Sequence, residues 1–536
     1  MPSQRLRIFA GVIVLLLLPM MVFGQLDHIS VVSDGVPDFG AVDGTWGHLQ
    51  YYRPYGIKGI ELKDWRDLSE VSLLSGEPFN TDRQGWIPLD SSASMWYQMH
   101  PELTAPADTT AASLLVNYKQ GDGAFKDFTL WYHNSLDEQT RYGWTSKLRS
   151  HPRVLLATEY DEQRHRVQMN RETEEYSLTT EAGYTHQVNP LYAIRFDTTL
   201  SNYVYDDTPQ IISDRWDGNV EWNNLDSNGT GSEVFASVQA GIWSWQAADQ
   251  KSIVGTAYYG KRFSLGQYEP FLFKMGMISK QLGGTRRTRA LLEFISPRLH
   301  WKNLSSTVGI KNIGKNALLP DIDLQFKRSL LNLTYETVHV IEDRTWDPNF
   351  ASTLLHQISS SLNFSNLSVG ARGWQGKRGE VSVSGVQLGG QFYFPWEMKL
   401  NIDYNQVNNP ADWVFSEKFI DWELHQDFTL FKQALHSHLK VWGKHLLDTR
   451  PGILDLDNFQ ISNGISEGEK TLHLLNYTLS AQVSSVIFSF TDQNMLQDDL
   501  WNQYADIPWN INYTLMENQL TQSRFRYLSI IWVFDN

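Results

Sequence analysis

Residues Arg524 to Asn536 read Arg-Phe-Arg-Tyr-Leu-Ser-Ile-Ile-Trp-Val-Phe-Asp-Asn, and this stretch does most to decide the fold class. β-Branched and aromatic residues dominate it and no Pro or Gly interrupts it, so we predict a strand. A soluble domain seldom ends in so apolar a strand, because chain ends fray and an exposed edge pairs with other chains. A closed barrel removes that edge by pairing the last strand with the first. One row of alternate residues is Leu528, Ile530, Trp532 and Phe534, and a second apolar row is Phe525, Tyr527, Ile531 and Val533.

The stretch resembles the C-terminal signal strand of bacterial outer-membrane β-barrels, which ends in or near an aromatic residue. Here the aromatic residue is Phe534, and two further residues follow it. An edge strand of a secreted β-sandwich would read similarly. The rest of the chain must therefore decide between the two folds.

From about residue 112 onward, short runs alternate between polar and apolar residues, with polar turns between them. This period of two is typical of half-buried strands. The spacing of the runs predicts about 16 to 18 strands, the size class of porins. The expected fold is all-β, a transmembrane antiparallel up-and-down β-barrel. Apolar rows of this kind are Val234, Ala236, Val238, Ala240 and Ile242, and also Met398, Leu400, Ile402 and Tyr404.

Alternation alone does not tell which face is buried. A soluble sandwich turns its apolar rows inward, whereas a membrane barrel turns them toward lipid and its polar rows toward a wet lumen. A long meander without linkers, aromatic residues at predicted strand ends such as Trp243 and Trp245, and the C-terminal strand together favour the barrel. Four polar stretches are then predicted to be outer loops, namely 202–217, 342–349, 448–469 and 492–509.

The amino-acid composition excludes several classes of protein. The chain has 536 residues, 13% of them aromatic, a formal net charge of −15 and no Cys. The negative charge argues against binding to nucleic acid, which needs clustered positive charge. Without Cys, neither disulfides nor thiolate metal sites are available. A mean hydropathy of −0.37 excludes a polytopic helical membrane protein, although a barrel needs only alternate apolar residues.

The N-terminal region is expected to direct export. Arg5 and Arg7 precede an apolar run from Ile8 to Phe23, which predicts a signal peptide over residues 1–24. Residues 25–111 are irregular and are expected to form an extension, either periplasmic or at the barrel mouth. Residues 112–536 are predicted to form the barrel, in the cell outer membrane.

In its organisation, the chain resembles porin-like outer-membrane proteins of Gram-negative bacteria, particularly those of the Bacteroidota type. The resemblance rests on the predicted signal peptide, the tandem hairpins and the Phe534 terminus, and no residue-level motif accompanies it. It implies a channel for passive diffusion of small solutes, in contact with outer-membrane lipid. A homo-oligomer is compatible with this resemblance. Two alternatives stay open: a secreted carbohydrate-binding or glycoside-cleaving β-protein, and a non-conducting structural or secretion-associated barrel.

Charged residues on alternating strand positions are the candidate pore-lining residues. If their rows face the lumen, the arginines would form a basic ladder that attracts anionic solutes, with an opposite-charge pair nearby. A solvated rim at either end of the barrel is the competing interpretation. These candidates are Arg164 and Arg166, Arg287 and Arg289, and the pair Lys399 and Asp403.

His436 and His438 lie two positions apart, hence on one strand face, with His445 beyond them. Two imidazoles at that spacing can bind a metal ion. A polar lumen row is the favoured interpretation, because no third ligand is evident, and we expect no cofactor. No nucleophile elbow, phosphate loop or His-Glu-x-x-His motif is present, so no enzymatic activity is expected.

Overall fold

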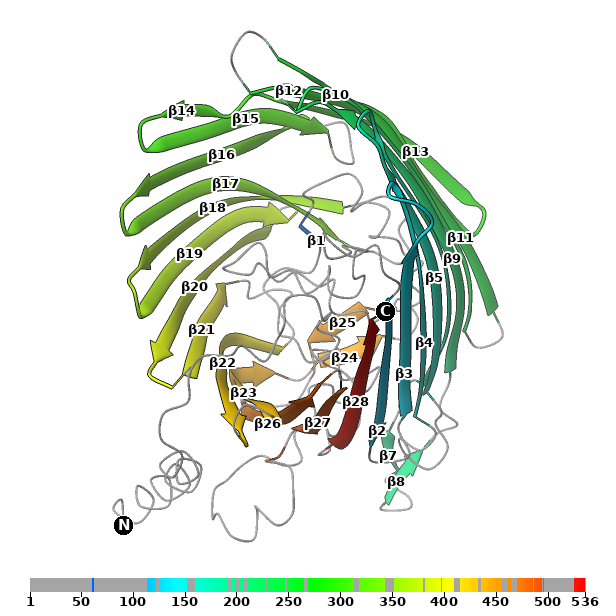
Figure 1. Cartoon of the computed structure of the whole chain (residues 1–536), viewed down its shortest axis with the longest axis vertical. Coiled ribbons are helices and arrows are strands. Elements are labelled where there is room, and N and C mark those ends of the chain that lie inside the picture. Colours follow the sequence, from blue (N-terminus) through cyan, green and yellow to red (C-terminus); the bar gives the residue numbers. More distant parts are fainter. Residues whose placement is uncertain are drawn as a thin grey trace.

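In the part of the chain that the structure describes, twenty-two antiparallel strands close into one barrel (Figure 1). The computed structural model describes residues 60–61, 113–121, 126–151, 160–190, 194–197, 202–205, 210–227, 229–245, 248–264, 269–312, 318–342, 351–378, 381–396, 398–408, 415–431, 435–450, 452–455, 460–463, 470–484, 486–493, 495 and 525–535. No helix among these residues is long and apolar enough to cross a membrane. The segment predicted as a signal peptide lies outside them.

The barrel strands are β2 (Ser113–Gly121), β3 (Lys126–Ser135), β4 (Thr140–His151), β5 (Tyr160–Glu172), β6 (Ser177–Pro190), β9 (Gln210–Leu225), β10 (Gly231–Trp245), β11 (Ala248–Phe263), β12 (Phe271–Leu282), β13 (Thr285–Ile295), β15 (Leu304–Asn312), β16 (Leu318–Arg328), β17 (Leu331–Glu342), β18 (Ala351–Asn363), β19 (Leu367–Arg378), β20 (Val381–Phe394), β21 (Met398–Asn408), β22 (Phe415–Leu430), β23 (Leu435–Arg450), β26 (Lys470–Val483), β27 (Val486–Gln493) and β28 (Phe525–Asp535). The shorter elements are β1 (Ile60–Glu61), β7 (Ile194–Asp197), β8 (Asn202–Tyr205), β14 (Leu299–Trp301), β24 (Gly452–Asp455) and β25 (Gln460–Asn463). Each barrel strand pairs with its neighbours in the chain, so the topology is up-and-down.

The last strand closes the barrel against the first. β28 pairs with β2 from Ser113 opposite Asp535 to Gly121 opposite Tyr527. On the inner side of this pair, Ser529 Oγ donates a hydrogen bond to Asn117 Oδ1 at 3.1 Å. The transmembrane up-and-down barrel predicted from the sequence is thus confirmed.

The number of strands exceeds the predicted 16–18. Tight connections such as 329–330 and 484–485 join neighbouring strands with only two intervening residues. The number of residues from the start of one strand to the start of the next is therefore smaller than the spacing of polar runs in the sequence indicates. In addition, β9 begins at Gln210, so the second half of the predicted loop 202–217 is strand.

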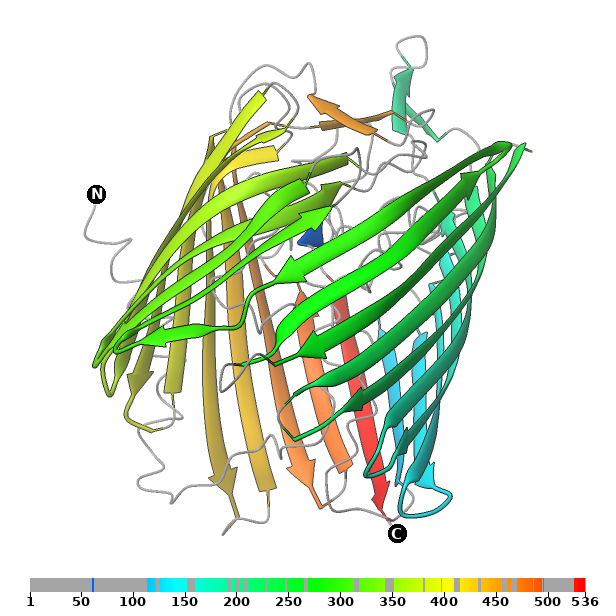
Figure 2. The same ribbon diagram turned by 90° about the horizontal axis from the view of Figure 1, so that it is seen from above.

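The two ends of the barrel differ in their connections (Figure 2). The end where β2 begins and β28 ends has short turns, including 329–330, 395–397 and 484–485. The opposite end carries the connections 191–209, 451–469 and 494–524, with the β7–β8 and β24–β25 hairpins within the first two. Outer-membrane barrels have short periplasmic turns and long extracellular loops. The short-turn end therefore faces the periplasm.

The short turns share a backbone feature. Among the described residues, five non-glycine residues have positive φ, and all five lie in turns at the periplasmic end: Lys302, Ser329, Trp396, Phe431 and Ser484. Left-handed backbone at a hairpin turn matches the right-handed twist of the flanking strands. Trp396 is 75% exposed and Phe431 78%, which places large aromatic side chains at the membrane interface.

Burial is inverted relative to a soluble protein. Apolar side chains in mid-strand are exposed, among them Val238 at 54%, Met277 at 57% and Ile358 at 62%. Polar side chains on the intervening positions are buried, including Glu293 at 2% and Gln387 at 1%. This pattern is what a lipid-facing outer surface and a polar interior require. In β28 it settles the register, because the row from Leu528 to Phe534 is exposed and Tyr527 is buried.

The ladder between β16 and β17 ends early. Pairing runs from Arg328 opposite Leu331 only as far as Asp323 opposite Glu336. Beyond that point, Thr337 Oγ1 accepts the Ile322 N–H at 2.8 Å and donates to the Pro320 carbonyl at 3.2 Å. Still nearer the outer end, β1 pairs with the freed edge of β17, at Val340 and Ile341. Side chains and a segment from the N-terminal region thus replace part of this backbone ladder.

Candidate functional site

The inward-facing rows carry the candidate site, because any solute crossing the barrel meets them. Among the described residues, ionisable side chains from neighbouring strands form several groups on this inner wall, including the pair Asp127 and Arg149 and three further groups. Each group forms because residues facing each other across an antiparallel ladder have Cβ atoms only about 5 Å apart. Their charges largely compensate one another.

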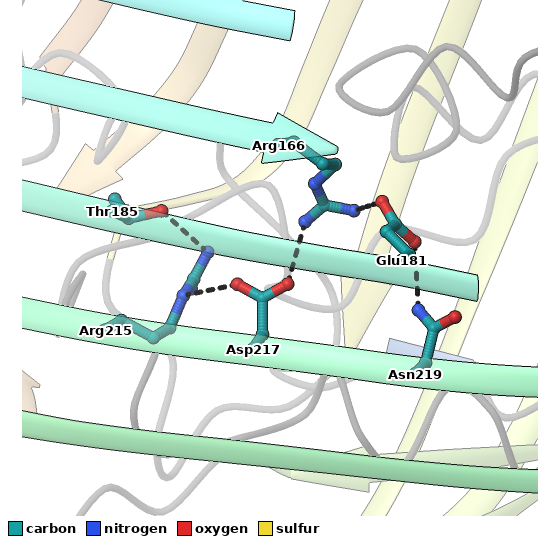
Figure 3. A network of polar contacts seen from close by, with 6 residues as sticks. All are labelled: Arg166, Glu181, Thr185, Arg215, Asp217 and Asn219. Carbon is teal, nitrogen blue, oxygen red and sulfur yellow. Dashed lines mark hydrogen bonds and ion pairs between the residues drawn. The ribbon is translucent and has the colours of Figure 1, made fainter. Parts of the chain in front are cut away.

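The first group spans β5, β6 and β9 (Figure 3). The Arg166 guanidinium donates to Glu181 and, at 3.3 Å, to Asp217 Oδ2. Arg215 Nε lies 3.7 Å from Asp217 Oδ1. Asn219 Nδ2 completes the group by donating to Glu181 Oε2 at 2.9 Å. The side chains of Arg166, Glu181 and Asp217 are 23%, 15% and 17% exposed, so this is a part-buried, charge-balanced network facing the lumen.

The second group consists of buried lysines paired with carboxylates. Lys311 Nζ lies 3.0 Å from Glu293 and 2.9 Å from Asp321, bridging β13, β15 and β16. On β10 and β12, Lys274 Nζ lies 2.8 Å from Glu233 Oε1. Both lysine side chains are 4% exposed. A buried ammonium is tolerated only with such partners, so these lysines hold the wall together and are not exposed charges available to a solute.

The third group lies on β22 and β23. His425 Nδ1 and His438 Nε2 face each other at 3.4 Å. His425 Nε2 bonds Glu423, and His438 Nδ1 lies 2.7 Å from Asp427 Oδ1. The four side chains are between 19% and 33% exposed, and they form a row on the inner wall.

The structure separates the three histidines singled out from the sequence. His438 pairs with His425 of the neighbouring strand, and not with His436. His445 lies on the outer row of β23, where it accepts a hydrogen bond from Trp422 Nε1 at 3.0 Å and contacts His473 at 2.6 Å. Among the described residues, no three His, Asp, Glu or Cys side chains converge on a point where they could hold a metal ion.

All six residues predicted to line a pore lie on inward rows. Arg164 and Arg166 alternate with the outward Val167, which is 56% exposed. Arg287 and Arg289 share the row of the buried Leu291 and Glu293, with Arg287 itself exposed. Their role toward a solute stays a prediction. Arg166 is charge-compensated, however, so it does not extend a purely basic ladder.

The structure does not bring Lys399 and Asp403 together. They lie on one row of β21, four residues apart, which is about 13 Å along a strand. Lys399 Nζ lies 5.8 Å from the centroid of the Tyr393 ring, and Asp403 stands opposite Asp421 of β22. Their role as opposite charges on the lumen wall stays a prediction.

Sequence reasoning missed Glu181, Asp217 and His425. Asp217 fell within a stretch read as a loop, because Asp214, Arg215 and Asp217 interrupt the apolar alternation of β9. His425 carried a usable signal: Glu423, His425 and Asp427 alternate on one strand face. Only the register across turn 431–434 shows that Asp427 stands opposite His438.

Comparisons with known proteins support the fold and not a sequence family. No protein-family model matches the sequence, and no curated protein matches it. Among solved structures, the siderophore receptor PirA from Acinetobacter baumannii matches with a TM-score of 0.59 at 8% identity, over 80% of this chain and 81% of that chain. The FrpB iron transporter from Neisseria meningitidis matches with a TM-score of 0.60 at 6% identity, over 80% and 82%. The ferric enterobactin receptor PfeA from Pseudomonas aeruginosa matches with a TM-score of 0.57 at 9% identity, over 80% and 82%.

The chain is therefore an outer-membrane β-barrel, with the architecture of these receptors and transporters. The prediction of a passive porin was wrong. Porins of 16–18 strands leave an aqueous channel, whereas this barrel has 22 strands and its solved neighbours are siderophore receptors and iron transporters. The two alternatives do not match either. The exposed apolar rows contradict a secreted β-protein, and none of the neighbours described above is a secretion-associated barrel.

Proposed function

We propose that the chain is a receptor-type outer-membrane transporter, which binds a solute at the long-loop end and releases it to the periplasm through a gated lumen. The observation that carries this proposal is the closed circumference of 22 strands. A barrel this wide, if left open, would leak solutes indiscriminately, and transporters of this size have an occupied lumen.

The N-terminal region is the proposed occupant. Its support is β1, because Ile60 and Glu61 pair with β17 at Ile341 and Val340, close to the outer end of that strand. Residues 25–111 are then an insert that docks on the barrel, and residues 1–24 a cleaved signal peptide. Relationship to Bacteroidota outer-membrane proteins is part of this proposal, resting on the organisation of the chain.

The proposed solute is a metal chelate or another polar compound too large for general porins. Two neighbours are described as receptors for siderophores or ferric enterobactin, and a third as an iron transporter. The charge-balanced inner wall around Arg166 and Asp217 suits a polar solute of mixed charge. The proposal includes no enzymatic step, and a homo-oligomer is not required by it.

Single-channel recording in planar bilayers tests gating. The full chain is expected to show no steady large conductance, whereas a variant lacking residues 25–111 but keeping the barrel is expected to conduct strongly. Heat-modifiability on gels verifies that both forms are folded. A steady open conductance of the full chain would overturn the receptor proposal.

Ligand recognition is tested separately. Tryptophan fluorescence of the full chain is expected to change on titration with a panel of ferric chelates, since the chain contains 20 Trp. Deletion of the gene is expected to slow growth of the source bacterium on the chelate that binds. If no chelate binds and iron-limited growth is unaffected, the solute is not a ferric chelate, whatever the outcome of the conductance experiment.

A further inference from the structure

Two histidines on the inner wall, His425 and His438, share an unusual hydrogen-bonding arrangement. We call them the histidine pair. Each uses one ring nitrogen to bond a carboxylate, His425 Nε2 to Glu423 and His438 Nδ1 to Asp427. Their remaining nitrogens, Nδ1 of His425 and Nε2 of His438, point at each other across the β22–β23 ladder at 3.4 Å.

This arrangement determines which nitrogens carry hydrogen. An ionised carboxylate only accepts hydrogen bonds, so the nitrogens facing Glu423 and Asp427 are the protonated ones. A neutral imidazole has one N–H and one lone pair. In the neutral state the two facing nitrogens therefore both present lone pairs, and these repel unless a cation lies between them.

We propose that this cation is a divalent transition metal ion, bound by Nδ1 of His425 and Nε2 of His438. Zinc lies about 2.0–2.1 Å from imidazole nitrogen with tetrahedral angles, which separates two such nitrogens by about 3.3–3.4 Å. The observed 3.4 Å agrees with that value.

The surroundings of the pair support the same assignment. Metal-binding histidines commonly donate their second N–H to a carboxylate, which orients the ring and makes it a stronger ligand. Here both histidines do so. Lys440 Nζ lies 3.1 Å from Glu423 Oε1, and Lys399 stands opposite His425 on β21. Lys440 offsets the charge of Glu423, so a bound ion would be held by the two ring nitrogens and not by net negative charge.

Within the described part of the chain, the site supplies two protein ligands. This agrees with the finding that no three potential ligands converge among the described residues. The His425 and His438 side chains are 22% and 19% exposed on the lumen wall, so water or donor atoms of a passing solute have access. A bound ion would therefore keep open coordination positions, as metal sites that exchange ligands do.

Metal binding to the purified full chain in detergent tests the proposal without requiring transport. The protein is stripped with a chelator and titrated with Co²⁺, followed by visible absorption, and with Zn²⁺, followed by calorimetry. The variants are His425→Gln and His438→Gln. His436→Gln is the matched control, because His436 lies on the same inward row two residues from His438 but bonds neither member of the pair. Heat-modifiability verifies folding, and either single variant suffices if the other does not fold.

The wild type and His436→Gln are expected to bind one more ion than His425→Gln or His438→Gln, with a tetrahedral Co²⁺ spectrum. Asp427→Asn is expected to weaken binding about 10–100-fold, because it removes the carboxylate behind the ligand. Equal binding by the wild type and both pair variants would overturn the inference and leave a shared proton between the rings. This result is independent of the conductance and chelate experiments, so the proposed function and the metal site can fail separately.

Discussion

Arg166 and Asp217 lie 51 positions apart in the sequence, yet Nη2 of Arg166 is 3.3 Å from Oδ2 of Asp217. Gly183, on the strand between them, makes this approach possible. A Cβ at that position would lie 2.8 Å from the same Asp217 oxygen. The network around Arg166 thus depends on three strands being in register and on one small residue in the middle.

Replacing Arg166 with Ala is expected to destabilise the barrel by about 2 kcal/mol. The change leaves Glu181 and Asp217 without their shared cation, and breaking a fully buried pair costs about 3–5 kcal/mol. The wet lumen reduces that figure here, because the Arg166 side chain is 23% exposed. Urea unfolding in detergent, followed by tryptophan fluorescence, measures the difference. Arg171→Ala, an exposed arginine on the same strand, is the control, and equal stability of the two variants would contradict the prediction.

A disulfide between β2 and β28 is expected to form across the closure of the barrel. Asn117 stands directly opposite Ile531. Opposite Cα atoms in an antiparallel pair are about 4.5–5.5 Å apart, within the range of a disulfide. The chain has no Cys, so Asn117→Cys with Ile531→Cys adds the only two thiols. Mild oxidation should cross-link this variant, as judged by gel migration with and without reductant.

Asn117→Cys with Tyr527→Cys is the matched control for closure. Tyr527 stands opposite Gly121, four residues further along β2, so the two thiols would be too distant to join. Efficient cross-linking of this pair, or none in the first, would show that the strands close in another register.

Thr337→Val is expected to destabilise the barrel by about 1–3 kcal/mol, the cost of leaving buried hydrogen-bonding groups unpaired. The Thr337 hydroxyl bonds both the Ile322 N–H and the Pro320 carbonyl, where the β16–β17 ladder has ended. Thr337→Ser keeps the hydroxyl and should unfold at the wild-type urea concentration. If Val is tolerated as well as Ser, the side-chain bridge does not contribute to the stability of the wall.

The β3–β4 turn is expected to weaken only in acid. Hydrogen bonds from the backbone N–H of Gln139, and then from Thr140, hold the pKa of Asp137 below its ordinary value. A carboxyl whose pKa is lowered in the folded state stabilises above its ordinary pKa and loses that contribution as pH falls through the folded pKa. The difference between wild type and Asp137→Ala should therefore be constant above about pH 5 and shrink below about pH 4.

Amide hydrogen exchange at Thr140 measures this difference, expressed as a protection factor at each pH. Asp137→Asn keeps an oxygen acceptor without a titrating proton, so its protection should not change over the same range. Loss of protection near neutral pH in the wild type would show that another group controls the turn.

Much of the fold could be predicted because strand alternation is local information. A row such as Val234, Val238 and Ile242 is visible in ten residues, and all three side chains are exposed on the barrel surface. The long polar stretches at 342–349 and 492–509 likewise correspond to outer connections between β17 and β18 and between β27 and β28. The strand number could not be predicted as well, because two-residue turns leave almost no polar signal between adjacent strands.

The candidate site could be predicted less completely from the sequence. Arg164 and Arg166 could be assigned to one face, but their partners lie on strands whose registers depend on intervening connections. The same holds for His438, whose relevant neighbour is His425 across a turn and not His436 two residues away. A row of polar residues on one strand shows that the barrel wall is polar there. Only the residues on the neighbouring strands show whether the charges of that row are already neutralised.

The terminal strand β28 shows most clearly what the sequence decided and what only the tertiary structure decided. The sequence by itself predicted a strand over residues 524–536 and favoured a membrane barrel, because period-two alternation and an apolar end follow from local residue order. It did not determine which of the two apolar rows faces lipid, because both rows of that strand are apolar. Pairing with β2 decided this by setting Ser529 beside the buried Asn117 and turning Trp532 and Phe534 outward. Closure, strand number and the cross-strand charge groups are likewise properties of the whole ring, since each needs strands far apart in the sequence to meet in register.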